Sequence, residues 1–346
     1  MYRALRITVC VCLLSLTQAV SASDACSMRS VVTSANVAVS DGSSFMTQSF
    51  FQSKNAAAIR HMSDKDQMVV AEGPYGWARV GDSEKMGSEF EKTFALGHQF
   101  HAFLLYFDEI VSNLRESGEI SFQGKEHRAL SGELPQGGLV HLIADKGGLQ
   151  APGLVFELPG SKPIIAAFSD WTSTGQSEVP FQVEVDDGER LFTYRYTTID
   201  TTPKSPLWFF EAVSLPSFDE IAVYRLHRQL LAAHCLGDAD MIARLSSAQI
   251  LSVSNGAMEW VANPSVRDRF AQLFERLEYT AYYDVMLPII EVAEGSHLGW
   301  VGASVRAVGT ESRQGTPFDN QWAWLMIVRK EHGKWLHAGN ASNLAQ

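Results

Sequence analysis

The sequence predicts an α+β protein with many antiparallel strands and few helices. Three observations lead to this prediction. Alternating apolar and polar residues recur along the first half, and one long helical pattern interrupts them. After residue 216 the order changes to helices first and a series of strands afterwards. A chain of 346 residues, 46% of them hydrophobic, is long enough to build a core in each of two domains.

The first 22 residues are typical of a cleaved secretory signal peptide. Arg3 and Arg6 precede an apolar run from Ile7 to Val20, and small residues follow around Ala22. A transmembrane anchor is the alternative, but the run is shorter than the roughly 20 residues that a span needs. We therefore expect a periplasmic or secreted protein that is not integral to the membrane.

Two of the four cysteines would survive this cleavage. Cys10 and Cys12 are removed, and Cys26 and Cys235 remain. An oxidising compartment would allow the remaining two to form a disulfide. In the alternative, Cys235 is a small buried apolar residue and Cys26 lies in a frayed tail. The sequence leaves both possibilities open.

The charge pattern argues against a nucleic-acid partner. The formal net charge is −11, and no run of lysines or arginines occurs. Binding of DNA or RNA requires a basic surface that replaces counterions, so we expect none. The sequence also has no phosphate loop, Gly-rich dinucleotide turn or paired CxxC motif. We therefore expect no cofactor.

Residues 24–215 are predicted to form a curved antiparallel half-barrel with one helix packed against it. The segment from Phe90 to Leu114 has apolar residues at helical spacing along its whole length. Residues 181–200 alternate in polarity on both sides of a turn at Gly188, which is the pattern of a β-hairpin.

The second predicted domain covers residues 216–346, because prolines punctuate the extended stretch that ends at Pro216. Gly237 predicts the end of the first helix, Asp238 the cap of the second, and Pro264 the first turn of the third. The expected elements are helices over 218–236, 239–245 and 264–277 and strands over 250–255, 279–287, 298–308, 320–329 and 334–340.

The last two of these strands should form a hairpin with its turn at His332-Gly333. Apolar side chains occur at both alternating sets of positions along the first strand of this hairpin. We therefore expect both faces of the hairpin to be covered by other parts of the protein.

The element order and three segments of the second domain resemble the SnoaL-like branch of the nuclear transport factor 2-like superfamily. The segments are LLAAHCLGDADMIARL, VSNG and the closing hairpin RKEHGKW with NASN, all within residues 218–343. The resemblance implies a cone in which helices and a bent sheet enclose a mostly apolar pocket. It also implies either an enzyme, such as an isomerase, cyclase or hydrolase, or a binding module.

The resemblance permits a test of ketosteroid-isomerase chemistry. Counting from Gly237, the tyrosine that polarises the substrate falls on Leu230, and the general base falls at Ser254. The second carboxyl falls within Trp324–Ile327, and Asn340 stands where some relatives have a histidine. None of these side chains can shuttle a proton. We therefore expect a cone that binds a ligand without this chemistry.

Polar and aromatic side chains near the strand ends are the candidate pocket lining of the second domain. Asp284 is a candidate base if it points inward and a solvated strand residue if it points outward. Asp319 and Gln321 are placed at the pocket mouth, and the alternative is a salt-linked sheet face with Arg306. The full set is Tyr282, Asp284, Asp319, Gln321, Trp322, Asn340 and Ser254.

A Gly/Pro-rich loop followed by a broad amphipathic hairpin, residues 158–200, resembles the periplasmic lipoprotein-carrier superfamily. The resemblance implies an open antiparallel barrel that holds acyl chains or other hydrophobic cargo. His101, Leu104 and Phe107 lie on the apolar stripe of the long helix and are the candidate pocket residues of this half.

Histidines recur at helical spacing, and we expect them to be structural. His98 and His101 are three apart on an apolar stripe, and a third metal ligand would have to come from elsewhere. His227 and His234 are seven apart on one face of the first helix of the second domain. We predict core or pocket-lining histidines and no metal site.

These observations predict an exported two-domain protein that binds a hydrophobic small molecule or lipid without catalysis. The alternative is an enzyme, an isomerase, cyclase or hydrolase, that acts on a hydrophobic small molecule in the C-terminal cone. A homodimer formed through the C-terminal domain is a further expectation.

Overall fold

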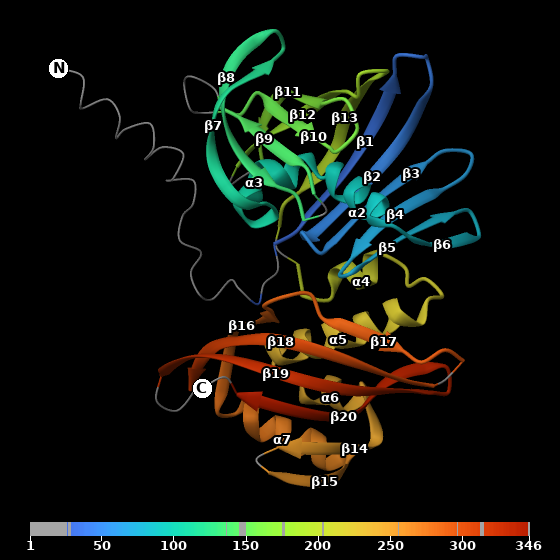
Figure 1. Cartoon of the computed structure of the whole chain (residues 1–346), viewed down its shortest axis with the longest axis vertical. Helices are drawn as coiled ribbons and strands as arrows, with labels where there is room; N and C mark the ends of the chain where they lie inside the picture. The colour runs from blue at the N-terminus through green and yellow to red at the C-terminus, as the bar shows by residue number, and fades with distance from the viewer. Residues whose placement is uncertain are drawn as a thin grey trace, which may run out of the picture. The chain divides into compact units, whose positions relative to one another are not determined.

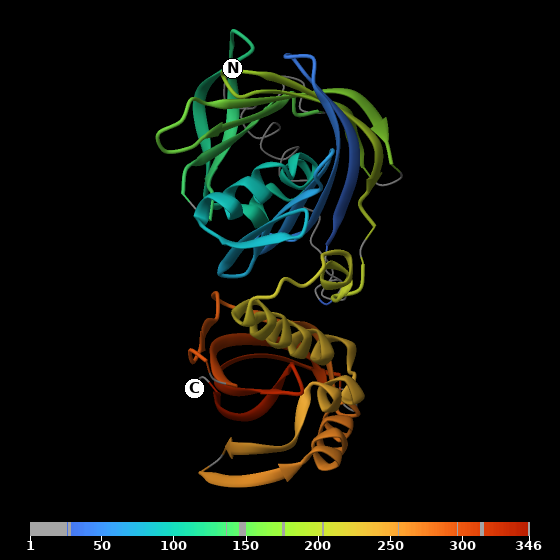
Figure 2. The ribbon, with the colours of Figure 1, turned by 90° about the vertical axis from the view of Figure 1, so that its right-hand side faces the viewer.

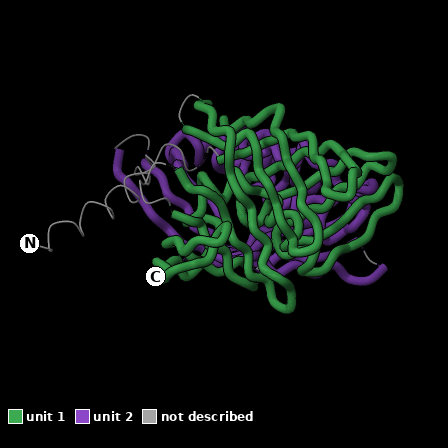
Figure 3. The backbone as a smooth tube through the Cα atoms, turned by 90° about the horizontal axis from the view of Figure 1, so that it is seen from above, with its two compact units in different colours: residues 1–19, 29–203 green, residues 20–28, 204–346 purple. Residues whose placement is uncertain are grey.

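The computed structural model describes Cys26 and residues 29–135, 137–144, 150–174, 177–202, 204–254, 256–295, 297–311 and 315–344. The chain divides into two compact units (Figure 3). The first contains residues 29–203, and the second contains Cys26 and residues 204–346. The predicted signal peptide, residues 1–22, lies outside the described residues. No helix in the described ranges is long and apolar enough to cross a membrane.

The cut between the units falls at residue 204, earlier in the chain than the predicted boundary at residue 216. Residues 204–215, which lie between the observed and the predicted boundary, contain a short helix, α4 (Trp208–Ala212), and this helix belongs to the second unit. Trp208 and Phe209 of this helix are buried. The proline-rich stretch therefore straddles the cut instead of ending at it.

A single 13-stranded antiparallel sheet makes up most of the first unit (Figure 1). Its strands are β1 Val31–Val39, β2 Ser44–Ser53, β3 Ala56–Met62, β4 Gln67–Glu72, β5 Tyr75–Val80, β6 Ser83–Gly87, β7 Ser112–Phe122, β8 Lys125–Glu133, β9 Leu139–Ile143, β10 Gly153–Glu157, β11 Ile164–Ser173, β12 Glu178–Asp186 and β13 Leu191–Asp200. The order is β6-β5-β4-β3-β2-β1-β13-β12-β11-β10-β9-β8-β7, so the first strand pairs with the last. The sheet curves around two helices (Figure 2). Strands β6 and β7 stand at the two ends of the strand order and are the edges of the sheet.

The long helix predicted from Phe90 to Leu114 is wrong. The segment forms two helices, α2 (Glu89–Gly97) and α3 (Phe100–Ile110), and then enters β7, where Leu114 is exposed. At the break, the Gln99 side-chain amide donates to the carbonyl oxygens of Ala58 on β3 and Ala95 on α2, at 3.0 and 2.8 Å. This anchoring of the link to the sheet competes with a continuous helix, and apolar spacing alone does not reveal it.

Two glycines let α2 approach the sheet closely. A Cβ atom at Gly76 on β5 would lie 2.9 Å from the Ser88 carbonyl oxygen, and one at Gly87 would lie 2.8 Å from the Cβ of Glu91. Ser88 caps α2, and the Glu91 carboxylate accepts from the Ser88 backbone N–H at 2.7 Å. The start of the helix is therefore fixed against β5 and β6. The main core of the unit lies between this face of the sheet and the two helices.

The second unit has helices on one face of a bent seven-stranded sheet (Figure 2). Its remaining helices are α5 Asp219–Leu236, α6 Ala239–Arg244 and α7 Asn263–Phe274, and its strands are β14 Ser246–Ser254, β15 Ala257–Ala262, β16 Leu277–Asp284, β17 Ile289–Val292, β18 Leu298–Glu311, β19 Thr316–Glu331 and β20 Lys334–Leu344. The order is β15-β14-β20-β19-β18-β16, and β17 also pairs with β18. The α+β class and the cone predicted from the sequence are confirmed.

The predicted helix ends and turns of this unit are also confirmed. Gly237 ends α5 with a φ of +63°, which favours glycine, and the Asp238 side chain accepts from the Met241 backbone N–H at 2.7 Å. His332 and Gly333 both have positive φ, +49° and +80°, at the turn between β19 and β20. Residues 257–262 and 289–292 form strands that the sequence did not predict.

Candidate functional site

The strand register separates two faces of the sheet in the second unit. Val305 on β18 pairs with both Asp284 and Trp322, and its neighbour on the same face, Ala303, pairs with Trp324. Paired residues point to the same side of a sheet, so these side chains share one face. The core formed with α5 lies on that face. We call it the inner face, and the residues that alternate with it lie on the outer face.

A histidine and an aspartate form a buried pair on the inner side of this unit. His227 on α5 donates from Nε2 to a carboxylate oxygen of Asp284 on β16, over 2.7 Å. The side chain of His227 is 0% exposed and that of Asp284 is 9% exposed. A guanidinium nitrogen of Arg228 lies 3.5 Å from the other carboxylate oxygen. The inward alternative for Asp284 is therefore the one that the structure shows.

One atom of this pair and one atom of a neighbouring tryptophan are buried without hydrogen-bond partners among the described residues. They are Nδ1 of His227 and the indole Nε1 of Trp324. The two rings meet edge to face, with their centroids 5.7 Å apart. An unsatisfied buried polar group costs about 1–3 kcal/mol, so a polar group of a bound molecule that reached these atoms would gain hydrogen bonds from both.

The chemistry of the two atoms is complementary. When Nε2 of His227 carries the proton that Asp284 accepts, Nδ1 keeps a lone pair and is an acceptor or base. The indole N–H of Trp324 is a donor only. The site can therefore take the proton of one group of a bound molecule and donate a hydrogen bond to another.

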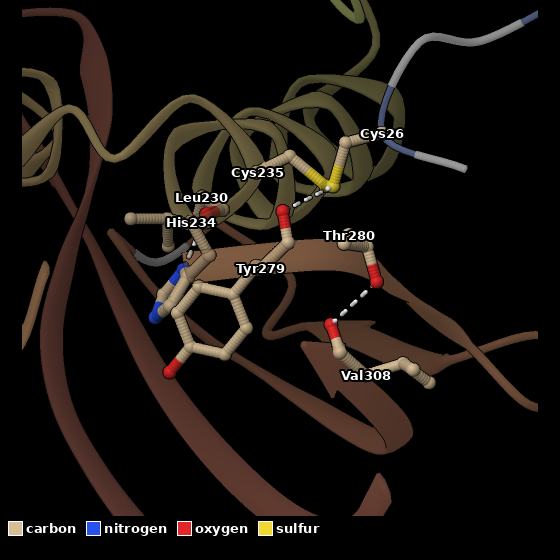
Figure 4. The surroundings of a disulfide bond; sticks show 7 residues. All are labelled: Cys26, Leu230, His234, Cys235, Tyr279, Thr280 and Val308. Carbon is tan, nitrogen blue, oxygen red and sulfur yellow. Dashed lines mark hydrogen bonds between the residues drawn. A yellow bond between two sulfur atoms is a disulfide. The ribbon is translucent and has the colours of Figure 1, made fainter. Parts of the chain in front are cut away.

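Helix α5 places two histidines on this side because they are seven residues, about two turns, apart. His234 donates from Nδ1 to the Leu230 carbonyl oxygen at 2.7 Å and stacks on Tyr282 with ring centroids 4.3 Å apart. Burial lowers the pKa of His234 to about 4 and raises the pKa of Tyr279, beside it, to about 12 (Figure 4). His234 is thus a structural histidine, as predicted, whereas His227 has a carboxylate partner.

The residue next to His234 forms a disulfide. Cys235 is bonded to Cys26, with their Cα atoms 5.4 Å apart (Figure 4). The bridge joins the segment before the first unit to α5 of the second unit. Of the two possibilities that the sequence left open, the structure shows the disulfide.

Three further predicted pocket residues lie on the inner face. Tyr282 is stacked on His234, Trp322 pairs with Val305 and is half-buried, and Asn340 pairs with Met326 and is half-buried. Burial raises the pKa of the Tyr282 hydroxyl. These residues come from three strands, so the inner face brings them into one region with Asp284.

The other predicted pocket residues do not join them. Asp319 and Gln321 lie on the outer face, where Asp319 accepts from Arg306 at 2.7 Å and Gln321 donates to Ser304 at 2.9 Å. The salt-linked alternative therefore holds for these two. Ser254 is exposed at the end of β14, where it pairs with Ala257. The sequence placed the pocket mouth on the wrong face of the sheet, because a shift of one residue along a strand moves a side chain to the opposite face.

The candidate residues of the first unit are mostly enclosed in its core. His101 and Phe107 are 2% and 6% exposed, and Leu104 is half-buried. The Nε2 atom of His101 donates to the Pro180 carbonyl oxygen at 2.8 Å. The described residues contain no group of three His, Cys, Asp or Glu side chains that could share a metal ion.

Sequence reasoning missed His227 as a member of the site. Its spacing from His234 was noted, but nothing in the sequence showed which carboxylate lay opposite. The available signal was parity: Asp284 is two residues from Tyr282 on one strand, and both should face the helix that carries the histidines. Trp324 was counted only among the apolar residues.

Apolar side chains also gather on the outer face of the second sheet. The expectation that both faces of the last hairpin are covered is wrong, because Leu325 on β19 is 45% exposed. Leu325 pairs with Ala341 on β20 and with Gly302 on β18. Gly302 in turn pairs with Ile289 on β17. The neighbouring strands add more exposed apolar residues to this outer patch, which consists of Val253, Met258, Trp260, Ile289, Leu298 and Leu325.

Comparisons with known proteins give matches at the level of solved structures. No family model matches the chain, and no curated protein matches it. A ketosteroid isomerase-like protein from Erwinia carotovora atroseptica is 13% identical, with a TM-score of 0.33, over 38% of this chain and 99% of that one. A nuclear transport factor 2-like protein from Cytophaga hutchinsonii is 14% identical, with a TM-score of 0.32, over 37% of this chain and 99% of that one.

A third solved structure belongs to the same group. It is a nuclear transport factor 2-like superfamily protein from Salmonella enterica, 8% identical with a TM-score of 0.32, over 35% of this chain and 87% of that one. At these identities and TM-scores, the likeness of the chain to nuclear transport factor 2-like proteins concerns the fold alone.

Proposed function

We propose that the second unit binds a small, mostly apolar molecule on its inner face and that His227 acts on this molecule as a general base. The observation that carries the proposal is the His227–Asp284 pair, a buried imidazole with a carboxylate on one nitrogen and no described partner on the other. The apolar side chains around the pair, such as Val305 and Met326, would contact the rest of the molecule.

The proton movement follows from the tautomer. Nδ1 of His227 takes a proton from the bound molecule, and the imidazolium that forms is stabilised by the Asp284 carboxylate. The electron pair left behind moves onto an oxygen of the molecule, which accepts a hydrogen bond from the Trp324 indole. Return of the proton to another atom of the molecule completes an isomerisation. The proposed substrate is therefore a carbonyl compound with an acidic C–H group.

This proposal differs from the sequence-based preference for binding without catalysis. That preference relied on Leu230 and Ser254, which occupy the positions expected for ketosteroid-isomerase chemistry. In the structure, Leu230 is buried in the core and Ser254 is exposed. The acid–base pair instead comes from α5 and the end of β16, so its position is independent of the pattern that was tested.

We also propose that the protein is exported and works in an oxidising compartment. The Cys26–Cys235 disulfide supports this, because such bonds persist mainly outside the reducing cytosol. A hydrophobic cargo in the first unit, like that of lipoprotein carriers, stays a prediction.

The experiment uses the full chain purified from its own export compartment. Native mass spectrometry should show a retained small molecule, which is then extracted and returned to the wild-type protein in D2O. We expect deuterium to enter the molecule about 10²–10⁴ times faster than with His227→Gln. Trp324→Phe should slow the exchange as well.

The control is Arg306→Ala, on the outer face, which should exchange at the wild-type rate. A protein that retains no molecule would contradict the binding part of the proposal. A retained molecule that exchanges equally with wild type and His227→Gln would contradict the catalytic part and favour a binding protein.

The outer patch supports a second copy of the chain as partner. The molecule carries a net charge of −11, but all six residues of the patch are apolar, so contact between two copies there would bring no charged side chains of the patch together. Met258 and Trp260 are 72% and 65% exposed. Light scattering should show a dimer for the wild type and a monomer for Trp260→Glu. A wild-type monomer would contradict this proposal.

A further inference from the structure

Two histidines of the first unit have neighbouring rings on the side of the sheet that the helices cover. His61 lies on β3 and His98 is the residue that ends α2. Their ring centroids are 5.9 Å apart and their planes meet at 69°. The proposed acid–base pair of the second unit uses neither of them. The sequence predicted His98 and His101 as structural histidines three residues apart, and the structure adds His61 as a neighbour of the His98 ring.

One nitrogen of each ring is available for a ligand. Nδ1 of His98 lies 2.8 Å from the Phe94 carbonyl oxygen, which can only accept, so this nitrogen carries the proton. Nε2 of His98 then keeps its lone pair. Nε2 of His61 is buried and has no hydrogen-bond partner among the described residues. A ring held by a backbone carbonyl through one nitrogen is the usual state of a metal-binding histidine.

Both rings are neutral at physiological pH. Burial, together with the neighbouring His98, lowers the pKa of His61 to about 4. Burial also lowers the pKa of His98 from its ordinary value. Neutral imidazole is the form that binds metal ions. The two rings therefore need not lose a proton before they bind an ion.

Aromatic rings surround the pair. The ring centroid of Phe45 is 5.0 Å from that of His61, and the ring centroid of Phe94 is 4.2 Å from that of His98. Aromatic faces attract cations, but they supply no anionic ligand. A positive charge placed between the histidines would thus be stabilised by neutral groups only.

The ligand set selects the ion. Imidazole suits zinc, copper, iron and nickel. Structural zinc requires four ligands, and within the described residues no third His, Cys, Asp or Glu joins this pair. A divalent ion buried without an anion costs much more desolvation free energy than a monovalent one. We propose that His61 and His98 bind one copper(I) ion between their rings.

Competition with a coloured chelator tests this proposal. The full chain is titrated with copper(I) under anaerobic conditions, with ascorbate as reductant and bicinchoninate as the competing ligand, so that the disulfide stays oxidised. We expect one ion per chain. His61→Phe and His98→Phe should each weaken binding by more than about tenfold. His332→Asn is the matched control, since it removes a histidine from an exposed turn with a φ of +49° that asparagine tolerates.

A measurement on the wild-type protein avoids dependence on the variants. Copper(I) should shift the ring signals of His61 and His98 in the NMR spectrum and leave those of His227 unchanged. Binding of equal strength in all variants, or ring signals of the pair that do not move, would overturn the proposal. Tighter binding of zinc than of copper(I) at the pair would overturn the choice of ion.

Discussion

Two buried histidines, one from each unit, have different kinds of partner. In the first unit, His101 donates to the Pro180 carbonyl oxygen and packs edge to face on Tyr196. In the second unit, His227 donates to the Asp284 carboxylate and keeps its other nitrogen without a described partner. A carbonyl satisfies a neutral ring, whereas a carboxylate also stabilises the charged ring that a base becomes. The comparison teaches that the partner of a buried histidine, and not its burial, indicates a role in proton transfer.

The largest expected effect is the loss of Asp284. Asp284→Ala removes the partner of a fully buried imidazole and of the Arg228 guanidinium, so the free energy of unfolding should fall by about 3–5 kcal/mol. Urea denaturation followed by tryptophan fluorescence measures this change. Asp284→Asn keeps an acceptor for His227, so it should lower the free energy of unfolding by less. A loss within error for both variants would mean that the pair is solvated and would remove the contrast between the units.

Acid should destabilise both units through their carbonyl-bonded histidines. Burial lowers the pKa of His101 and of His234 to about 4, below the unfolded value of about 6.5. Between these values the unfolded chain binds more protons, so stability is full above about pH 6.5 and is lost as the pH falls towards 4. Each histidine should contribute on the order of 3 kcal/mol to this loss.

Single replacements separate the two contributions. His101→Phe should reduce the pH dependence of the free energy of unfolding of the first unit. His234→Phe should do the same for the second unit. Urea denaturation between pH 4 and 7 measures both effects. Unchanged slopes in both variants would show that the two rings are solvated or already charged.

A smaller effect tests the packing of the first unit. Gly76→Ala would bring a Cβ atom 2.9 Å from the Ser88 carbonyl oxygen and should lower the free energy of unfolding by about 1–3 kcal/mol. Gly97→Ala is the control, because a Cβ atom there meets nothing within 4 Å. Equal stability of the two variants would show that α2 can move away from the sheet. Thermal denaturation of the full chain measures both.

The smallest expected effect concerns the outer face. Arg306 and Asp319 form an ion pair there, and both are exposed to solvent. Because water and salt screen such pairs, Arg306→Ala should leave the unfolding temperature and any proton exchange on a bound molecule unchanged. A clear loss of exchange in this variant would place the active region on the outer face and contradict the assignment to His227.

Local signals predicted most of the second unit. Gly237, Asp238 and Pro264 each act on their own backbone, so the helix boundaries followed from single residues. The long helix of the first half failed because its break depends on Gln99 reaching Ala58, some 40 residues earlier in the chain. Contacts of that range leave no periodic trace in a sequence.

The site was only partly predictable for the same reason. Tyr282 and Asp284 share one parity along β16 and both lie on the inner face, but parity along one strand does not tell which parity of the next strand faces inward. Asp319 and Gln321 were therefore placed on the wrong side. His227 was passed over because its partner lies 57 residues away on another element.

The bridge between Cys26 and Cys235 has a consequence for proteolysis. The two cysteines are 209 residues apart, and the whole first unit lies between them in the chain. At its ends, the Ser30 hydroxyl donates to the Thr202 carbonyl oxygen at 2.6 Å, so the chain enters and leaves that unit at one place. A protease that nicks any of its loops would leave two fragments covalently joined. The damaged protein would migrate as a single species until a reductant separated the pieces.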